Sequence, residues 1–238
     1  MGFYDHFHSS EGGSITAIGR RLVAMKNQYF IELVKRYCPA RDIVILEIGC
    51  GQGFFAQQCR QNDIAYAAFE ANEMMANALA AQGFEVHRGF APPLSISKQF
   101  DVIFMDQVFE HMRGRDEAIE MIETCKAHLK PGGILLICSP DIFTIKEDFF
   151  SDYTHNNPTC MPMLDRIFMD CELEIVYRNH VVQFIRGLLT TRVLAFIVRI
   201  SYALGLFHLA FGKRAHLAKV SLLPSCVIIG RLVTPSSH

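Results

Sequence analysis

The stretch from Val44 to Phe55 constrains the fold of this 238-residue chain more than any other part of the sequence. It begins with Val-Ile-Leu-Glu-Ile, an almost wholly apolar run that is typical of a strand covered on both faces. Gly49, Gly51 and Gly53 follow, where the missing Cβ lets the backbone bend sharply or approach a ligand closely. The next residues begin a predicted helix whose first N–H groups lack partners within the helix. The stretch therefore predicts a strand, a turn and a helix that bind a nucleotide-like cofactor.

The spacing of the glycines and the charge beside them narrow the choice of cofactor. The alternative to a cofactor site is a tight turn between strand and helix that binds no ligand. The nicotinamide fingerprint G-x-G-x-x-G has its last glycine one residue later, where this chain has Phe54. Glu47, at the end of the strand, favours a positively charged group such as an ammonium over a pyrophosphate.

A second acidic residue follows the next predicted strand, residues 65–69. Glu70 ends this strand and lies 23 residues after Glu47. A carboxylate at this place can accept hydrogen bonds from both hydroxyls of a ribose. The two carboxylates together are a more specific signal than either one alone.

The fourth predicted strand covers residues 100–106 and is followed by a short polar segment. Ligands of open parallel sheets bind at the carboxyl ends of the strands. We therefore expect Asp106 and Gln107 to face the cofactor, and Glu110 and His111 to face the acceptor.

These motifs resemble those of class I S-adenosylmethionine-dependent methyltransferases, over residues 43–177. Glu47-x-Gly49-x-Gly51-x-Gly53 resembles their first motif, and the strand beginning Phe-Asp-Val-Ile, the Glu-His pair and the Leu-Lys-Pro-Gly-Gly turn at 129–133 also recur in them. The chain most resembles the small-molecule group that includes the ubiquinone-biosynthesis O-methyltransferases. The resemblance implies S-adenosylmethionine as the cofactor, in contact with Glu47, Gly49, Cys50, Gly51, Gly53, Glu70, Ala71 and Met75.

One part of the expected cofactor site departs from the family. Relatives usually carry an acidic residue near Phe90 that holds the adenine amino group, and this chain has none there. The backbone of Phe90 and Ala91 could hold the adenine instead. For Met75, the alternative to adenine contact is an ordinary place in the core.

Two histidines are candidates for proton transfer. A neutral imidazole at His111 can remove a proton from an attacking hydroxyl, and Glu110 could orient it or raise its pKa. The alternative is that this pair holds the following loop. His155 belongs to a D-x-x-H-x-x-P-T stretch, residues 152–159, which resembles one near the acceptor pocket of relatives. A capping or hinge role is the alternative for this stretch, in which Thr159 could cap a helix at 160–170.

No metal is expected. His6 and His8 lack a third ligand nearby, and the chain has no acidic cluster of the catechol-methyltransferase type. A nucleic-acid acceptor is also disfavoured, because residues 106–109 are not the proline-rich tetrapeptide of base-methylating relatives and no Pro-Cys dipeptide occurs.

We expect an α/β, Rossmann-like fold with a seven-stranded, mostly parallel sheet and helices on both faces. Residues 1–40 would form an aromatic arm and a lid helix at 18–37, and residues 41–180 the cofactor-binding core. Residues 181–225 would form an apolar, basic helical insertion. Residues 226–238 would add the last strand, in an antiparallel pair at the edge of the sheet, and a tail.

The insertion is the most individual part of the chain. Up to Glu174 there are 15 basic and 24 acidic residues, and after it eight basic and no acidic residues. Arg192, Arg199 and Lys213 are spaced by multiples of seven, which predicts one basic helical face. The longest stretch without Lys or Arg, residues 200–212, is shorter than the roughly 20 residues that span a bilayer.

Three roles remain open for the insertion: a hairpin that caps the active site, an element that lies on an anionic membrane surface through residues 181–219, or a homodimer contact. The acceptor would be a small molecule or a lipid-linked molecule. A methyltransferase-fold scaffold or subunit without activity, docked on a membrane, is the alternative function. Eight cysteines without a C-x-x-C pair and a polar N-terminal segment favour a cytoplasmic protein, or one peripheral on the inner face of a membrane.

Overall fold

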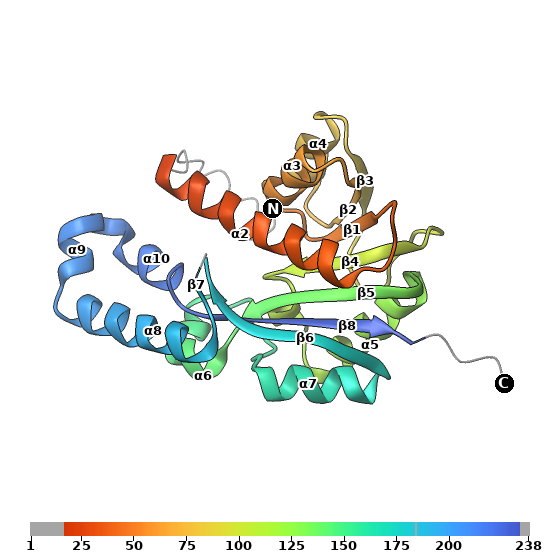
Figure 1. Ribbon diagram of the computed structural model, residues 1–238. Helices are drawn as coiled ribbons and strands as arrows, with labels where there is room; N and C mark the ends of the chain where they lie inside the picture. The colour runs from red at the N-terminus through yellow and green to blue at the C-terminus, as the bar shows by residue number, and fades with distance from the viewer. Residues whose placement is uncertain (1–16, 184, 234–238) are drawn as a thin grey trace. The chain divides into compact units, whose positions relative to one another are not determined.

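The computed structural model describes residues 17–183 and 185–233 (Figure 1). The expected aromatic arm therefore lies outside the described residues, apart from its last position. The strands are β1 (Val44–Ile48), β2 (Ala65–Glu70), β3 (Glu85–Arg88), β4 (Phe100–Asp106), β5 (Leu129–Pro140), β6 (Leu173–Val182), β7 (Ile185–Arg186) and β8 (Ser225–Leu232). The α-helices are α2 (Ala17–Tyr37), α3 (Phe54–Gln61), α4 (Glu73–Ala80), α5 (Arg115–His128), α6 (Ile142–Ile145), α7 (Met161–Asp170), α8 (Leu188–Ala203), α9 (Leu206–Phe211) and α10 (Ala215–Val220). Short 3₁₀ segments are η1 (Phe109–His111), η2 (Lys146–Ser151) and η3 (Gly212–Arg214).

The strands form a Rossmann-like, mostly parallel sheet in the order β3-β2-β1-β4-β5-β8-β6-β7. Adjacent strands are parallel in the pairs β1–β2, β1–β4 and β2–β3. The sheet has eight strands where the sequence predicted seven, because β6 turns back and pairs antiparallel with the two-residue β7. The last strand, β8, lies between β5 and β6, so its predicted place at the edge is wrong.

The chain divides into two compact units. The first, here called the glycine-turn unit, comprises Met1–Met105, Glu120–Leu135 and Leu232–His238. In it α2 contacts α3, while α3 and α4 contact β2. Phe104 on β4 anchors its core, with ring centroids 5.0 Å from Phe30 on α2 and 4.3 Å from Phe55 on α3. Burial of these three rings fixes α3, and with it the turn that precedes α3.

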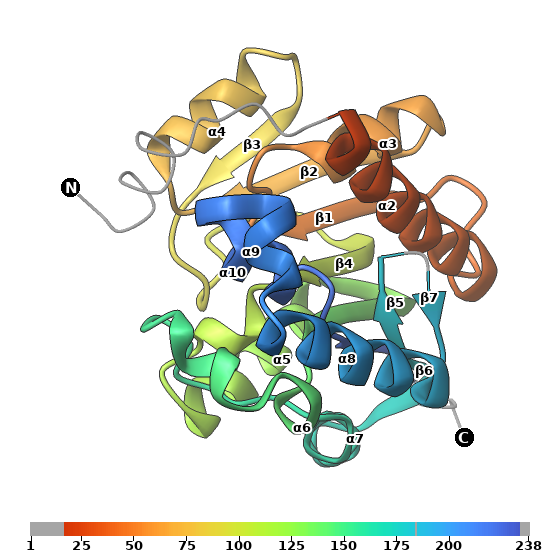
Figure 2. The same cartoon turned by 90° about the vertical axis from the view of Figure 1, so that its left-hand side faces the viewer.

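The second unit, here called the histidine unit, comprises Asp106–Ile119 and Leu136–Arg231. In it α7 and α8 contact β6, and α8, α9 and α10 contact one another (Figure 2). An apolar cluster joins this helical insertion to the segment after β5: Ala195, Val198 and Phe207 pack with Ile145 and Phe149. The insertion is therefore fixed to its own unit by one buried side.

Two local predictions are wrong. The turn expected at 129–133 is part of β5, and a Cβ on Gly133 would lie only 2.9 Å from the carbonyl oxygen of Lys130 and 3.0 Å from that of Asp101. Glycine at position 133 therefore lets the backbone carbonyls of Lys130 and Asp101 lie close to it. Thr159 does not cap α7: its Oγ1 donates to the carbonyl of Pro140 at 2.5 Å, and the N-cap of α7 is Cys160.

The single basic face expected on the insertion is also not formed. Gly205 and Gly212 interrupt the helix, both with positive φ, so Lys213 falls on a separate element. Arg199 points inward and donates to the carbonyl of Thr144 at 2.9 Å. Arg192, in contrast, is exposed. Tertiary partners thus divide residues that the sevenfold spacing would group together.

Candidate functional site

The glycine turn has the conformation that its sequence requires. Gly49, Gly51 and Gly53 all have positive φ, at 76°, 50° and 74°, a region that residues with a Cβ rarely adopt. The turn closes through a 2.9 Å hydrogen bond from the Gly53 N–H to the carbonyl of Cys50. A Cβ on Gly53 would also lie 2.8 Å from Cδ1 of Leu79. Position 53 thus needs glycine for both its backbone angle and its contact with α4.

The carboxylate of Glu70 closes one side of the turn. It is only 6% exposed. Its Oε1 accepts from the Asn72 N–H at 2.8 Å, and its Oε2 lies 3.4 Å from both the Gly51 N and the Cys50 Sγ. A carboxylate offers about four acceptor positions, and these contacts use three of them, the one from the Gly51 N–H being long. Glu70 therefore keeps acceptor capacity at the end of β2, beside the glycine turn.

Glu47 adds a second buried carboxylate to the same turn. It accepts a hydrogen bond from the Tyr66 hydroxyl. Burial, followed by the charge of Glu47, raises the pKa of Tyr66 far above its usual range. Burial and the charges of Glu70 and Glu47 likewise raise the pKa of the Cys50 thiol. Two carboxylates thus set a negative potential at the turn, which favours a cationic ligand and disfavours a pyrophosphate.

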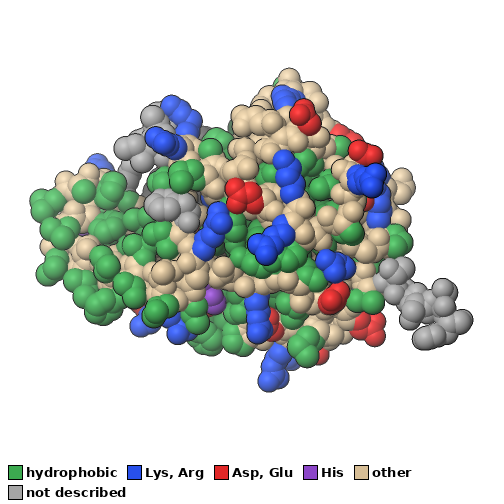
Figure 3. All heavy atoms as spheres, in the orientation of Figure 1, with side chains coloured by type: hydrophobic (Ala, Val, Ile, Leu, Met, Phe, Trp, Pro, Cys, Tyr) green, Lys and Arg blue, Asp and Glu red, His purple; other side chains and the backbone are tan. Residues whose placement is uncertain are grey.

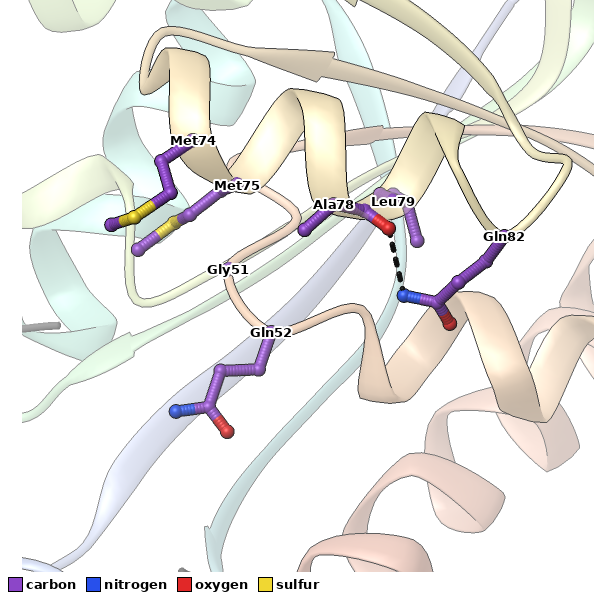
Figure 4. Close-up of a pocket in the computed structure, with 7 residues that line it drawn as sticks. All are labelled: Gly51, Gln52, Met74, Met75, Ala78, Leu79 and Gln82. Carbon is purple, nitrogen blue, oxygen red and sulfur yellow. Dashed lines mark hydrogen bonds between the residues drawn. The ribbon is translucent and has the colours of Figure 1, made fainter. Parts of the chain in front are cut away.

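A cavity of about 290 Å³ opens between the turn and α4 (Figure 4). Asn72 caps α4 by accepting from the Met75 N–H at 3.0 Å. No lining side chain is charged, and two of the lining residues, Gly51 and Met75, were predicted from the sequence. The residues that the sequence reasoning missed are Gln52, Met74, Ala78, Leu79 and Gln82.

Helical spacing was the available signal for most of the missed residues. Met74 and Met75, Ala78 and Leu79, and then Gln82 follow the three-to-four-residue repeat of one face of α4 and its end. Of the other predicted cofactor contacts, Ala71 and Phe90 are exposed and do not line this cavity, nor does Ala91.

The histidine unit brings together His111, His155 and Glu110. The two imidazole centroids lie 4.8 Å apart with planes at 65°. Nδ1 of His111 lies 2.9 Å from Oγ1 of Thr154 and 3.3 Å from the carbonyl oxygen of the same residue. A carbonyl only accepts, so Nδ1 carries the proton and Nε2 is the nitrogen of His111 that bears the lone pair.

Asp152 supports this tautomer through Thr154. The Thr154 hydroxyl donates to Oδ1 of Asp152 at 2.6 Å, which leaves its oxygen to accept from His111. Burial alone would raise the pKa of Asp152, but hydrogen bonds from Thr154 and the nearby His155 and His111 outweigh it, so the pKa is lowered. The ionised carboxylate can only accept, and this fixes the direction of both hydrogen bonds.

Burial is also the main reason why the pKa of His111 is lowered from 6.5, with the neighbouring His155 second. Asp152 and the Thr154 carbonyl act in the opposite direction. His111 is therefore neutral at pH 7, as a proton acceptor must be. His155 donates from Nδ1 to the carbonyl of Phe149 at 2.8 Å, which ties it to η2.

Glu110 is fully buried and lies in η1, the short 3₁₀ segment that follows β4. Its carboxylate accepts from Ser139 Oγ at 2.9 Å, and its carbonyl accepts from the N–H groups of Asn156 and Asn157 at 3.0 Å. Glu110 thereby holds the loop that carries Thr154 and His155.

Asp106 is half-buried and Gln107 is exposed. Gln107 has a positive φ of 59°, and its side-chain amide lies 3.3 Å from Ser225 Oγ. Within the described part of the chain, two groups of metal-ligating side chains have atoms within 4.8 Å of one another: Glu110, His111 and His155, and Asp141, His180 and Cys226.

Comparisons with known proteins agree with the motifs. A family model described as "Methyltransferase domain" matches residues 23–170. The ubiquinone biosynthesis O-methyltransferase of Caulobacter vibrioides is 29% identical over 111 residues, a segment that spans 42% of this chain and 42% of that protein.

Solved structures share the fold at low sequence identity. An SAM-dependent methyltransferase from Archaeoglobus fulgidus is 18% identical, with a TM-score of 0.61 over 97% of this chain and 100% of that one. The CcbJ methyltransferase from Streptomyces caelestis is 13% identical, with a TM-score of 0.65 over 96% of each chain. This chain belongs to the methyltransferase domain family.

Proposed function

We propose that this protein transfers a methyl group from S-adenosylmethionine to a hydroxyl of a small-molecule acceptor. The observation that carries the proposal is the pair of buried carboxylates, Glu47 and Glu70, at a glycine turn that borders an uncharged cavity. Bound there, S-adenosylmethionine supplies a methyl group on a positively charged sulfur. The negative potential of the turn suits this cation and its ammonium group.

Each part of the glycine-turn unit has a role in the proposal. Glu70 accepts hydrogen bonds from the ribose hydroxyls, with the acceptor capacity that its contacts to Gly51, Cys50 and Asn72 leave. The thioethers and apolar stems of Met74 and Met75 cover the flat adenine, as polarizable side chains on one end of α4 can. The turn itself, with Gly49, Gly51 and Gly53, lies under the methionine part.

In the histidine unit, His111 is the proposed general base. Nε2 of His111 would take the proton of the acceptor hydroxyl as the hydroxyl oxygen receives the methyl group that the cofactor supplies. Asp152 and Thr154 act as positioning residues, because they hold the Nδ1–H tautomer, in which Nε2 is the basic nitrogen. Glu110 positions the loop of Thr154 and His155 through its carbonyl. The proposed role of His155 is to contact the acceptor.

The name of the Caulobacter relative, an O-methyltransferase, suggests an oxygen as the methyl acceptor. We propose a phenolic hydroxyl, because it ionises more readily than an aliphatic one and needs only a neutral imidazole as base. The abundance of apolar residues in the insertion also fits an acceptor that carries a lipid tail.

The first test is calorimetric titration of the folded protein with S-adenosylmethionine. The proposal expects one site per chain, and it fails if no binding occurs in protein whose circular dichroism shows the native fold. A second test replaces His111 with Ala and uses a panel of phenols as acceptors. Product formation should fall by about 10²-fold or more while S-adenosylmethionine affinity stays unchanged. Full activity in that variant would remove His111 from the chemistry.

A further inference from the structure

Helices α8 and α9 present a broad apolar surface to solvent. On α8 its centre is a stripe with the i, i+4, i+7 and i+11 spacing of one helical face, and α9 continues it. Phe196 is 65% exposed and Leu209 85%. This surface, the α8–α9 face, comprises Leu189, Val193, Phe196, Ile197, Ile200, Leu204, Leu206, Leu209 and Phe211. Figure 3 shows apolar side chains gathered over these helices.

The exposure of the α8–α9 face does not come from incomplete packing of the insertion against its own unit. The opposite side of the insertion already packs against Ile145 and Phe149. Two buried or half-buried cations also tie it down: Lys219 Nζ lies 2.8 Å from Oδ1 of Asp148, and Arg199 donates to the carbonyls of Thr144 and Ile145. The helices are thus held with their apolar stripe outward, and contiguous patches of this kind mark interaction surfaces.

Charge indicates what the α8–α9 face contacts. No acidic residue occurs after Glu174. Arg192 lies beside the stripe on α8, and Lys213 follows α9; both are exposed, and neither has an acidic partner among the described residues. An apolar surface bordered by unpaired cations is complementary to an anionic, apolar surface.

A second copy of this chain meets that description poorly. A twofold contact places the same patch on both partners, so Arg192 and Lys213 would face like charges from an insertion that has no acidic residue of its own. An anionic lipid bilayer supplies both phosphates and a hydrocarbon boundary. Among the described residues, no helix is long and apolar enough to cross a membrane.

We propose that the α8–α9 face docks on an anionic lipid bilayer, with its apolar side chains at the acyl boundary and Arg192 and Lys213 at lipid phosphates. The helices lie in the plane of the interface. This docking is independent of methyl transfer, and it goes beyond the proposed function.

The test is co-sedimentation with vesicles of phosphatidylcholine alone and of phosphatidylcholine mixed with phosphatidylglycerol, without S-adenosylmethionine or acceptor. We expect the protein to pellet with the anionic vesicles at low salt and to be released at about 1 M salt, where the Debye length is about 3 Å. The Arg192→Glu, Lys213→Glu variant should lose about 25-fold or more in partitioning, since each cation contributes about fivefold. The Phe196→Glu, Leu209→Glu variant should also remain in the supernatant.

A matched control carries Arg166→Glu and Met169→Glu, an exposed cation and an exposed apolar residue on α7. It should bind vesicles like the wild type. The proposal is overturned if the wild type does not pellet with anionic vesicles at low salt, or if the control loses binding as the other variants do. It is also overturned if light scattering finds a wild-type dimer that Phe196→Glu dissociates, which would assign the face to a second copy. Circular dichroism confirms the fold of each variant.

Discussion

Nδ1 of His111 lies 2.9 Å from Oγ1 of Thr154, and this contact fixes which nitrogen of His111 can accept a proton. The Thr154 hydroxyl gives its own proton to Asp152, so it receives one from His111. These residues are 43 positions apart in the chain. The relationship gives His111 a defined tautomer, which a role in holding a loop would not require.

Loss of the Thr154 hydroxyl should therefore impair turnover more than stability. We expect Thr154→Val to lower kcat about five- to tenfold, the equivalent of about 1–1.4 kcal/mol, because one hydrogen bond to the imidazole is removed while the side-chain volume is kept. Thr154→Ser, which retains the hydroxyl, is the matched control. Steady-state kinetics with a phenolic acceptor measures the effect, and equal kcat in Val and Ser variants would contradict it.

The pH dependence of activity should follow the lowered pKa of His111. Because the neutral imidazole is the base, kcat/KM should not depend on pH near pH 7. It should fall only as the pH drops through the pKa of His111, which lies below 6.5. Asp152 raises that pKa, so Asp152→Asn should move the acidic limb to still lower pH. Histidine NMR titration reads the same pKa without turnover, and a value at or above 6.5 would refute the burial argument.

Removal of the Glu70 charge should weaken cofactor binding. Glu70→Gln should reduce S-adenosylmethionine affinity about tenfold to a hundredfold, the range for a hydrogen bond to a charged group. Glu73→Gln is the control, because Glu73 is exposed and pairs with Arg88 on the surface. Calorimetric titration compares the two variants. If both bind like the wild type, Glu70 is not a ribose ligand.

Gly51 and Gly53, two of the three glycines of the turn, should differ in their tolerance of alanine. Both have positive φ, so each Ala should cost about 1–2 kcal/mol of backbone strain. Only at Gly53 would the new Cβ also meet buried Leu79, at 2.8 Å, whereas at Gly51 it meets nothing within 4 Å. Urea unfolding should show Gly53→Ala as the less stable variant. The reverse order would mean that α4 yields easily at Leu79.

The buried pair of Asp148 and Lys219 should stabilise the insertion. Asp148→Asn would leave a buried ammonium without its charged partner, and we expect a loss of about 3–5 kcal/mol in the free energy of unfolding. Glu147→Gln is the control: its carboxylate is exposed and contacts the same insertion through Arg199. Guanidinium unfolding followed by circular dichroism measures both. Equal stability of the two variants would show that water reaches Lys219.

The sequence predicted the strands and the glycine turn well, because these follow from local pattern. Val44–Ile48 and Phe100–Asp106 form strands with the bounds expected from their apolar runs. It could not predict the order of the last strands. The place of β8 between β5 and β6 depends on pairing between segments far apart in the chain, to which residue periodicity is blind.

The candidate site divides in the same way. Sequence by itself determined the family and the residue types at the turn, since glycines at alternate positions and a carboxylate after each of two strands are local requirements of the backbone and of charge. Only the tertiary structure decided that Thr154 contacts the His111 ring at Nδ1, and that Arg199 turns inward while Arg192 remains exposed. Which partner a polar side chain finds depends on what burial brings within hydrogen-bond distance, and a one-dimensional pattern carries no such distances.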